Sequence, residues 1–124
     1  MIDWSATLKG LRGDQRLLET IVKAASGEIP RLLAELRRAA AAGDFPALRL
    51  AAHTLKGSVR YFGAQPVLEA ALRLEAMGQE RNLEGADQVL PALDCAARQL
   101  LAALAEHAFS GNTVTMVEAK EVTP

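Results

Sequence analysis

The sequence predicts an all-α fold: an antiparallel up-and-down four-helix bundle with a short additional N-terminal helix. Half of the 124 residues are hydrophobic but only 4% are aromatic, and leucine and alanine, which favour helices, supply most of the apolar side chains. These apolar residues recur at spacings of three and four, which places them on one side of a helix. Short connections separate the periodic segments, and helices joined by short connections pack antiparallel.

Five helical segments are expected from this periodicity. Their approximate bounds are residues 3–11, 15–42, 45–62, 66–78 and 84–107. The buried stripe of the second segment is predicted to consist of Leu18, Val22, Ala25, Ile29, Leu32 and Leu36. Pro30 interrupts this segment, and because proline lacks a backbone donor and clashes with the preceding turn, we expect a kink or a break there.

Polar and glycine residues between the segments predict where helices begin and end. An aspartate is a good N-cap, and the candidates are Asp3 (or Ser5), Asp14 and Asp44. Glycine adopts the left-handed conformation that follows many helices, and the candidates here are Gly43, Gly63 and Gly78.

The chain divides into a bundle domain, residues 1–108, and a tail or linker, residues 109–124. The second part mixes Gly, Asn, Thr and Val with charged residues and shows no sustained helical period, so we expect it to be disordered. The only cysteine, Cys95, cannot form an intrachain disulfide. Its Ala- and Leu-rich surroundings predict a buried structural thiol.

Charge and hydropathy argue against several classes of partner. The formal net charge is −1, so there is no basic surplus to bind nucleic acid. The first residues lack the basic and apolar regions of a signal peptide, and no run approaches the roughly 20 apolar residues that span a membrane. We expect no nucleic-acid partner, no direct membrane insertion and a cytoplasmic location.

The third segment carries the most informative residues. Its predicted buried stripe consists of Leu48, Ala52, Leu55, Val59 and Phe62. His53 lies about 100° around the helix from Ala52, so it leaves the core, and Lys56, Gly57 and Arg60 share its face at i+3, i+4 and i+7. His107, the other histidine, has no such neighbours and is interpreted as an ordinary surface residue.

This face has the properties of a phosphoryl-transfer site. Glycine inside a helix costs roughly 0.5–1 kcal/mol relative to alanine, and Gly57 would let another protein's backbone approach the imidazole. Lys56 and Arg60 would place positive charge where the oxygens of a phosphoryl group sit. The competing interpretation of Gly57 is close packing against another helix.

The segment Ala52-His53-Thr54-Leu55-Lys56-Gly57-Ser58 resembles the phosphoacceptor signature of the histidine-containing phosphotransfer (HPt) family. The similarity covers roughly residues 2–104, and the pairs Gly63-Ala64 and Leu74-Glu75 also resemble the family's spacing. The resemblance implies a four-helix bundle in which His53 is phosphorylated, Lys56 assists the phosphoryl group and Gly57 gives a receiver domain its access. The sequence departs from the family at the bulkier residues 59–62, and Arg60 and Tyr61 would lie near the docking surface.

The implied function is that of a phosphorelay module in a two-component system. It would accept a phosphoryl group on His53 from a receiver-domain aspartate and pass it to another receiver aspartate. A neutral imidazole nitrogen, most simply Nε2, would be the nucleophile, with Nδ1 oriented by another contact or by water. The sequence contains no nucleotide-binding loop, so we expect no enzyme activity of its own.

The partners are expected to supply the remaining chemistry. The aspartyl phosphate and Mg²⁺ would come from the receiver domain, with no cofactor or metal held by this chain. Any kinase activity would lie in other domains of a parent hybrid histidine kinase, which could act in cis and tether the chain to the membrane. One bundle buries all five stripes, so we expect a monomer.

Three other interpretations compete with this one. A histidine kinase dimerisation domain typically has an acidic residue after its histidine and a Thr-Pro pair soon after, whereas Thr54 follows His53 and the next proline is Pro66. The phosphoacceptor domain of a chemotaxis kinase is a close relative, and the absence of kinase domains in this chain weighs against it. A helical partner-binding module that has lost phosphotransfer is disfavoured by the intact face of His53, Lys56 and Gly57.

Overall fold

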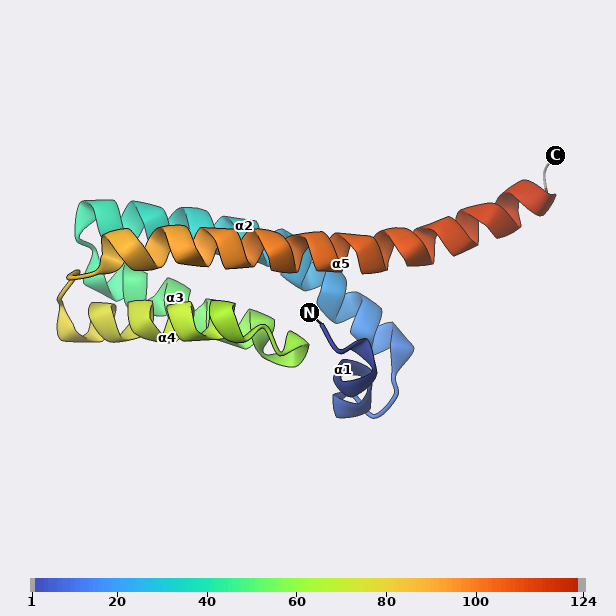
Figure 1. Cartoon of the computed structure of the whole chain (residues 1–124), viewed down its shortest axis with the longest axis horizontal. Helices are drawn as coiled ribbons and strands as arrows, with labels where there is room; N and C mark the ends of the chain where they lie inside the picture. The colour runs from blue at the N-terminus through green and yellow to red at the C-terminus, as the bar shows by residue number, and fades with distance from the viewer. Residues whose placement is uncertain (1, 123–124) are drawn as a thin grey trace.

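The predicted all-α fold is confirmed by the computed structural model (Figure 1). The structure describes the backbone of residues 2–122 and the side chains of residues 2–107. Within these residues the elements are α1 (Trp4–Gly10), α2 (Gln15–Ala42), α3 (Phe45–Val59), the 3₁₀ helix η1 (Arg60–Phe62), α4 (Gln65–Glu80) and α5 (Ala86–Val122). The long helices α2 to α5 form the bundle, and the short α1 lies across one end of it.

The core of the bundle is built from the predicted stripes. On α2, the buried side chains include all six members of the predicted stripe, Leu18, Val22, Ala25, Ile29, Leu32 and Leu36. On α3 and η1, the five predicted members are each at most 1% exposed. α3 packs between α2 and α4, while α5 packs against α2 and α4. The apolar period of three and four therefore predicted both the elements and the sides that they bury.

Three aspartates begin the helices as predicted. Asp3, Asp14 and Asp44 each accept a hydrogen bond from the backbone N–H three residues later, at 3.0, 3.0 and 3.2 Å. Such a cap satisfies a backbone donor that has no partner in the first helical turn, and it typically stabilises a helix by about 1 kcal/mol. The cap at Asp44 begins α3, and it therefore helps to fix the position of His53 along the bundle.

Of the kink or break expected at Pro30, the break is wrong. α2 is one continuous helix through this residue. Pro30 is exposed, whereas Ile29 and Leu32 beside it are almost completely buried. Burial of the stripe on both sides of the proline holds the helix together despite the missing backbone hydrogen bond.

The expected helix end at Gly78 is also wrong, because α4 continues to Glu80 and ends at Arg81 in the left-handed conformation. Gly78 is a packing contact instead. A Cβ atom there would lie 2.8 Å from both Cβ and the backbone N of Arg49, and 2.9 Å from the carbonyl O of Phe45. Only a residue without a side chain allows α3 and α4 to approach this closely.

The last helix and its cysteine differ from the prediction as well. The backbone of α5 remains helical to Val122 rather than ending near His107, in keeping with the strong helix formers at 118–121. This helical backbone differs from the disorder expected for residues 109–124. All side chains from residue 108 onward lie outside the described residues, so the division into a bundle domain, 1–108, and a tail or linker, 109–124, stays a prediction. Cys95 is exposed, not buried, because it lies on the side of α5 opposite Leu93 and Ala97.

One further property of the helices concerns membranes. Within the described part of the chain, none of the helices combines the length and the apolar character that crossing a membrane requires.

Candidate functional site

His53 lies on the exposed side of α3, near the middle of the helix. Its side chain is 66% exposed, although Ala52 before it and Leu55 after it are completely buried. The buried stripe fixes the rotation of α3 about its axis, and that rotation presents the imidazole to solvent. The sequence therefore placed His53 on the correct side of its helix.

A carboxylate from the neighbouring helix orients this imidazole. Oε2 of Glu75, on α4, lies 2.8 Å from Nδ1 of His53, and Oε1 of the same carboxylate lies 2.6 Å from Nζ of Lys56. Glu75 follows the fully buried Leu74 in α4 and is itself only 18% exposed. The three side chains form a small polar network across the α3–α4 contact.

The network keeps the carboxylate charged. The hydrogen bond from Lys56 is the main cause that lowers the pKa of Glu75 below its ordinary value; the hydrogen bond with His53 also lowers it, while burial acts in the opposite direction. A charged carboxylate can only accept hydrogen bonds, so Nδ1 of His53 must carry the proton that it donates. In the neutral imidazole this leaves Nε2 with its lone pair free.

Gly57 lies one turn after His53, on the open side of α3. A Cβ atom at this position would meet no atom within 4 Å. Packing against another helix therefore does not explain this glycine, and the alternative raised from the sequence is wrong. Because Gly57 has no side chain, no atoms project from α3 beside the imidazole at this position.

The two remaining predicted site residues follow directly after α3. Arg60 and Tyr61 belong to η1, where the chain tightens into a 3₁₀ turn after Val59. Both are exposed, as predicted. In the described part of the chain, none of the ion pairs includes Arg60, whereas Lys56 is paired with Glu75. Lys56 therefore joins the network around His53, whereas the shared face expected for Arg60 stays a prediction, since Arg60 lies in the 3₁₀ turn and not in α3.

Exposed apolar side chains lie on the same helices as His53 and Glu75 and on the turn that follows α3. Among the side chains that the structure describes, three of the four large exposed hydrophobic residues lie on the elements that form this surface: Leu50 (67% exposed), Leu72 (51%) and Tyr61 (44%). Leu50 precedes His53 by three residues and Leu72 precedes Glu75 by three, so each shares a helix face with its partner. A gathering of exposed apolar side chains around one polar group is typical of a protein-docking surface.

Sequence reasoning missed Leu50, Leu72 and the role of Glu75. Glu75 was noted only as part of a resemblance in spacing. Its role depends on the antiparallel register of α3 against α4, and one sequence does not reveal that register. Leu50 stands outside the predicted stripe of its segment, and this could have identified it as an exposed apolar residue. Leu72 was expected among the buried apolar residues of the fourth segment, and that expectation is wrong because its side chain is 51% exposed.

The surroundings of His53 contain few possible metal ligands. Among the side chains that the structure describes, no group of three or more His, Cys, Asp and Glu residues lies close enough together to hold a metal ion.

Comparison with known proteins identifies one family. The family model described as Hpt domain matches residues 20–107, which is more than half of the chain and includes α3, α4 and the network around His53. Searches of curated proteins and of solved structures returned no match.

Proposed function

Because the chain belongs to the Hpt domain family, whose members are phosphotransfer modules of phosphorelay signalling and not classical enzymes, we propose that His53 is its phosphoacceptor. Hpt domains interact with the receiver domains of response regulators. In this proposal, His53 takes a phosphoryl group from the aspartate of one receiver domain and passes it to the aspartate of another.

The observation that carries the proposal is the hydrogen bond between Nδ1 of His53 and Glu75, on a side chain that is otherwise open to solvent. Nε2 attacks the phosphorus atom of the aspartyl phosphate, and the P–O bond breaks with its electron pair going to the aspartate carboxylate. The new N–P bond leaves positive charge on the ring. Glu75 stabilises that charge through the Nδ1 proton, and the reverse transfer follows the same path.

Lys56 is proposed to assist the phosphoryl group. Its side chain is 25% exposed, and its ammonium group is paired with the carboxylate of Glu75. A phosphoryl group on Nε2 would bring negative charge close to this network, and Lys56 can then share its three donors between the carboxylate and a phosphoryl oxygen. Glu75 would remain bound to the Nδ1 proton.

The receiver domain is proposed to supply the Mg²⁺ and the remaining positioning groups. Its docking surface on this chain would consist of exposed residues of α3, η1 and α4, namely Leu50, Gly57, Arg60, Tyr61 and Leu72. We further propose that the chain acts as a monomer and that a kinase elsewhere, in cis or in another protein, draws the phosphoryl group from ATP.

The proposal is tested by replacing the acceptor. A radiolabelled, phosphorylated receiver with Mg²⁺ should label the wild-type protein with the acid-labile phosphate that is typical of phosphohistidine. His53→Gln should not be labelled, while its circular dichroism stays helical, and His107→Gln is the matched control that keeps the label. Labelling of His53→Gln would refute the assignment. A wild-type protein that binds receivers but is never labelled would support a binding module without phosphotransfer.

A further inference from the structure

A small hollow lies on the other side of α3 from Glu75, at the seam between α2 and α3. Its volume is about 110 Å³, and it opens to the surface. The residues that line it include Ile21, Ala24, Ala25 and Glu28 from α2, and Gly57 and Tyr61 from α3 and η1. We call this hollow the α2–α3 socket.

We propose that the α2–α3 socket binds one aliphatic side chain, of the size of leucine or isoleucine, from the receiver domain that docks on His53. This inference rests on the proposed function and adds a determinant of partner choice to it. The socket would fix the position of the receiver relative to the imidazole, and it would select receivers that carry such a side chain at the matching position.

The position of the socket connects it to the site. Gly57 lines it and lies one helical turn from His53, on the same open face of α3. A receiver that brings its aspartate to Nε2 therefore also covers the socket. Leu50 and Tyr61 extend the same surface with exposed apolar area.

The chemistry of the lining determines the kind of side chain. Ile21, Ala24 and Ala25 make the α2 wall apolar. A closed apolar cavity of roughly 150 Å³ accepts a benzene molecule, so an open socket of about 110 Å³ has room for one branched aliphatic group. A side chain that fills an apolar pocket near the centre of an interface is the typical source of binding energy.

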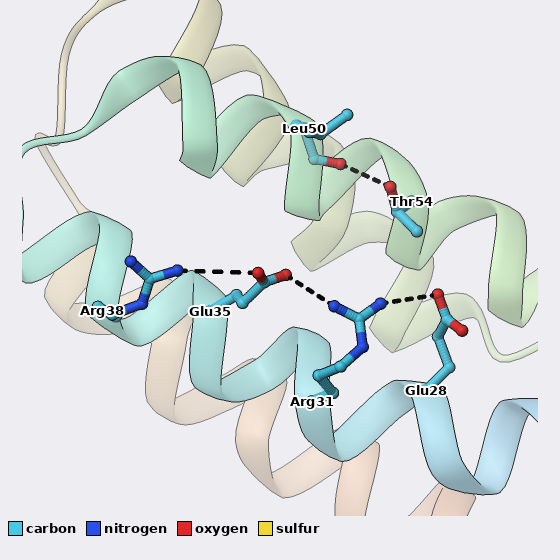
Figure 2. A network of polar contacts seen from close by, with 6 residues as sticks. All are labelled: Glu28, Arg31, Glu35, Arg38, Leu50 and Thr54. Atoms are coloured by element: carbon cyan, nitrogen blue, oxygen red, sulfur yellow. Dashed lines mark hydrogen bonds and ion pairs between the residues drawn. The ribbon is translucent and has the colours of Figure 1, made fainter.

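The charged rim of the socket is held in place along α2. Nη2 of Arg31 lies 3.0 Å from Oε1 of Glu28, and Nη1 lies 3.2 Å from Oε2 of Glu35. Figure 2 shows these side chains in a row on α2, beside the part of α3 that carries Leu50 and Thr54. The pair with Arg31 draws the carboxylate of Glu28 along its own helix. The socket thus has an apolar wall and a polar edge, which is the arrangement found in protein interfaces.

Gly57 supplies the second argument. A Cβ atom there would touch nothing within this chain, so the fold does not require glycine at this position, although glycine costs helix stability. The space that the missing side chain leaves open belongs to the socket. A side chain of the receiver domain that occupies this space would explain why glycine is present at position 57.

The experiment fills the socket with a larger side chain from α2, the helix that does not carry His53. Ala24 is exposed and lies on α2, so Ala24→Leu adds a side chain to the socket without overpacking the core. With a phosphorylated receiver that labels the wild-type protein, we expect the KM for phosphotransfer to rise at least fivefold while kcat changes less than twofold. Ala41→Leu is the matched control: it is an exposed alanine of the same helix that lines the groove toward α5, and its KM should stay at the wild-type value.

Chemical phosphorylation separates this inference from the proposed function. Phosphoramidate, a small donor that needs no docking, should label His53 equally in the wild type, Ala24→Leu and Ala41→Leu. If phosphoramidate labels the wild type but no receiver does, the proposed function fails. If the receiver reacts with Ala24→Leu at the wild-type KM, or if phosphoramidate labelling falls in this variant, the socket is refuted.

A double-mutant cycle identifies the side chain that enters. Surface residues of the receiver are shortened to alanine one at a time, and KM is measured with wild-type protein and with Ala24→Leu. One aliphatic residue should weaken transfer to the wild type but not to Ala24→Leu, because the filled socket no longer holds it. Coupling to a charged or aromatic residue only, or to none, would overturn the assignment.

Discussion

Gly57 and Gly78 are both glycines inside helices, where glycine costs roughly 0.5–1 kcal/mol relative to alanine, yet their surroundings are opposite. A Cβ atom at Gly57 would meet no atom within 4 Å, whereas one at Gly78 would lie 2.8 Å from the Cβ atom of Arg49. The space at Gly78 is filled by the neighbouring helix of the same chain. The space at Gly57 is open to a partner protein. Comparing the two positions therefore distinguishes a glycine that serves helix packing from one that serves partner binding.

The packed glycine also serves the site, although it does not touch it. Gly78 follows Glu75 by three residues on α4, and Arg49 precedes His53 by four residues on α3. The close contact therefore lies one turn away from the hydrogen bond between His53 and Glu75 on both helices. The separation of α3 and α4 at Gly78 sets whether the carboxylate of Glu75 can reach Nδ1.

The largest effect in this comparison is expected for Gly78→Ala. The added Cβ atom would lie against backbone and Cβ atoms that cannot move without shifting a helix, and we expect a loss of roughly 1–3 kcal/mol of unfolding free energy, as for other overpacked contacts. Urea unfolding followed by circular dichroism measures it. The transfer rate per folded molecule should also fall, because the helices separate next to Glu75.

Gly27→Ala is the matched control for this prediction. Gly27 is a helix-interior glycine whose Cβ atom would meet nothing within 4 Å, so its replacement should stabilise the protein slightly. Equal stability of Gly78→Ala and Gly27→Ala would contradict the close approach of α3 and α4 at Gly78.

An intermediate effect is expected for Glu75→Gln, which keeps a hydrogen-bond acceptor for His53 but removes the charge. Phosphotransfer should slow severalfold, because a neutral amide stabilises the positively charged ring less well. Glu69→Gln, at an exposed acid on the same helix, is the control and should transfer at the wild-type rate. A wild-type rate for Glu75→Gln would mean that the carboxylate only orients the imidazole.

The same variant has a defined pH dependence of stability. The Lys56 hydrogen bond, aided by His53, holds the pKa of Glu75 below its ordinary value of about 4.5. A depressed pKa stabilises the fold above the pKa of the unfolded chain, and this contribution is lost as the pH falls through the lower, folded pKa. The melting temperature of the wild type should thus exceed that of Glu75→Gln at neutral pH, and the difference should shrink below about pH 4.5. A difference that stays constant down to pH 3 would contradict the ion pair.

The sequence predicted the fold and the face of His53 well because both depend on local periodicity. The stripe from Leu48 to Phe62 determines how α3 rotates, and the rotation determines which side chains are exposed. Residues such as Glu75 depend on how two helices align, and neither composition nor spacing within one helix contains that alignment. The two glycines show the same limit of sequence-based prediction. The sequence predicts a helix end or an open position for either of them, and only the packing of α3 on α4 distinguishes them.

The smallest effect on stability, and the most informative, is expected for Gly57→Gln. Glutamine favours the helix interior over glycine by up to about 0.5 kcal/mol, and its Cβ atom would meet no neighbouring atom within 4 Å. The melting temperature should therefore stay equal or rise slightly. The new side chain would stand beside the imidazole and in the α2–α3 socket, so transfer from a phosphorylated receiver should slow severalfold or more. Thermal unfolding and a transfer time course on the one variant measure both effects.

Gly27→Gln provides the comparison for this variant, since it adds the same side chain to an open helix position that does not line the socket. It should share the small gain in stability and keep the wild-type transfer rate. Opposite changes of stability and rate at Gly57, and not at Gly27, would show that the open glycine serves the partner. A destabilised Gly57→Gln protein that transfers normally per folded molecule would show instead that Gly57, like Gly78, is a packing position, because a docking role predicts loss of rate without loss of stability.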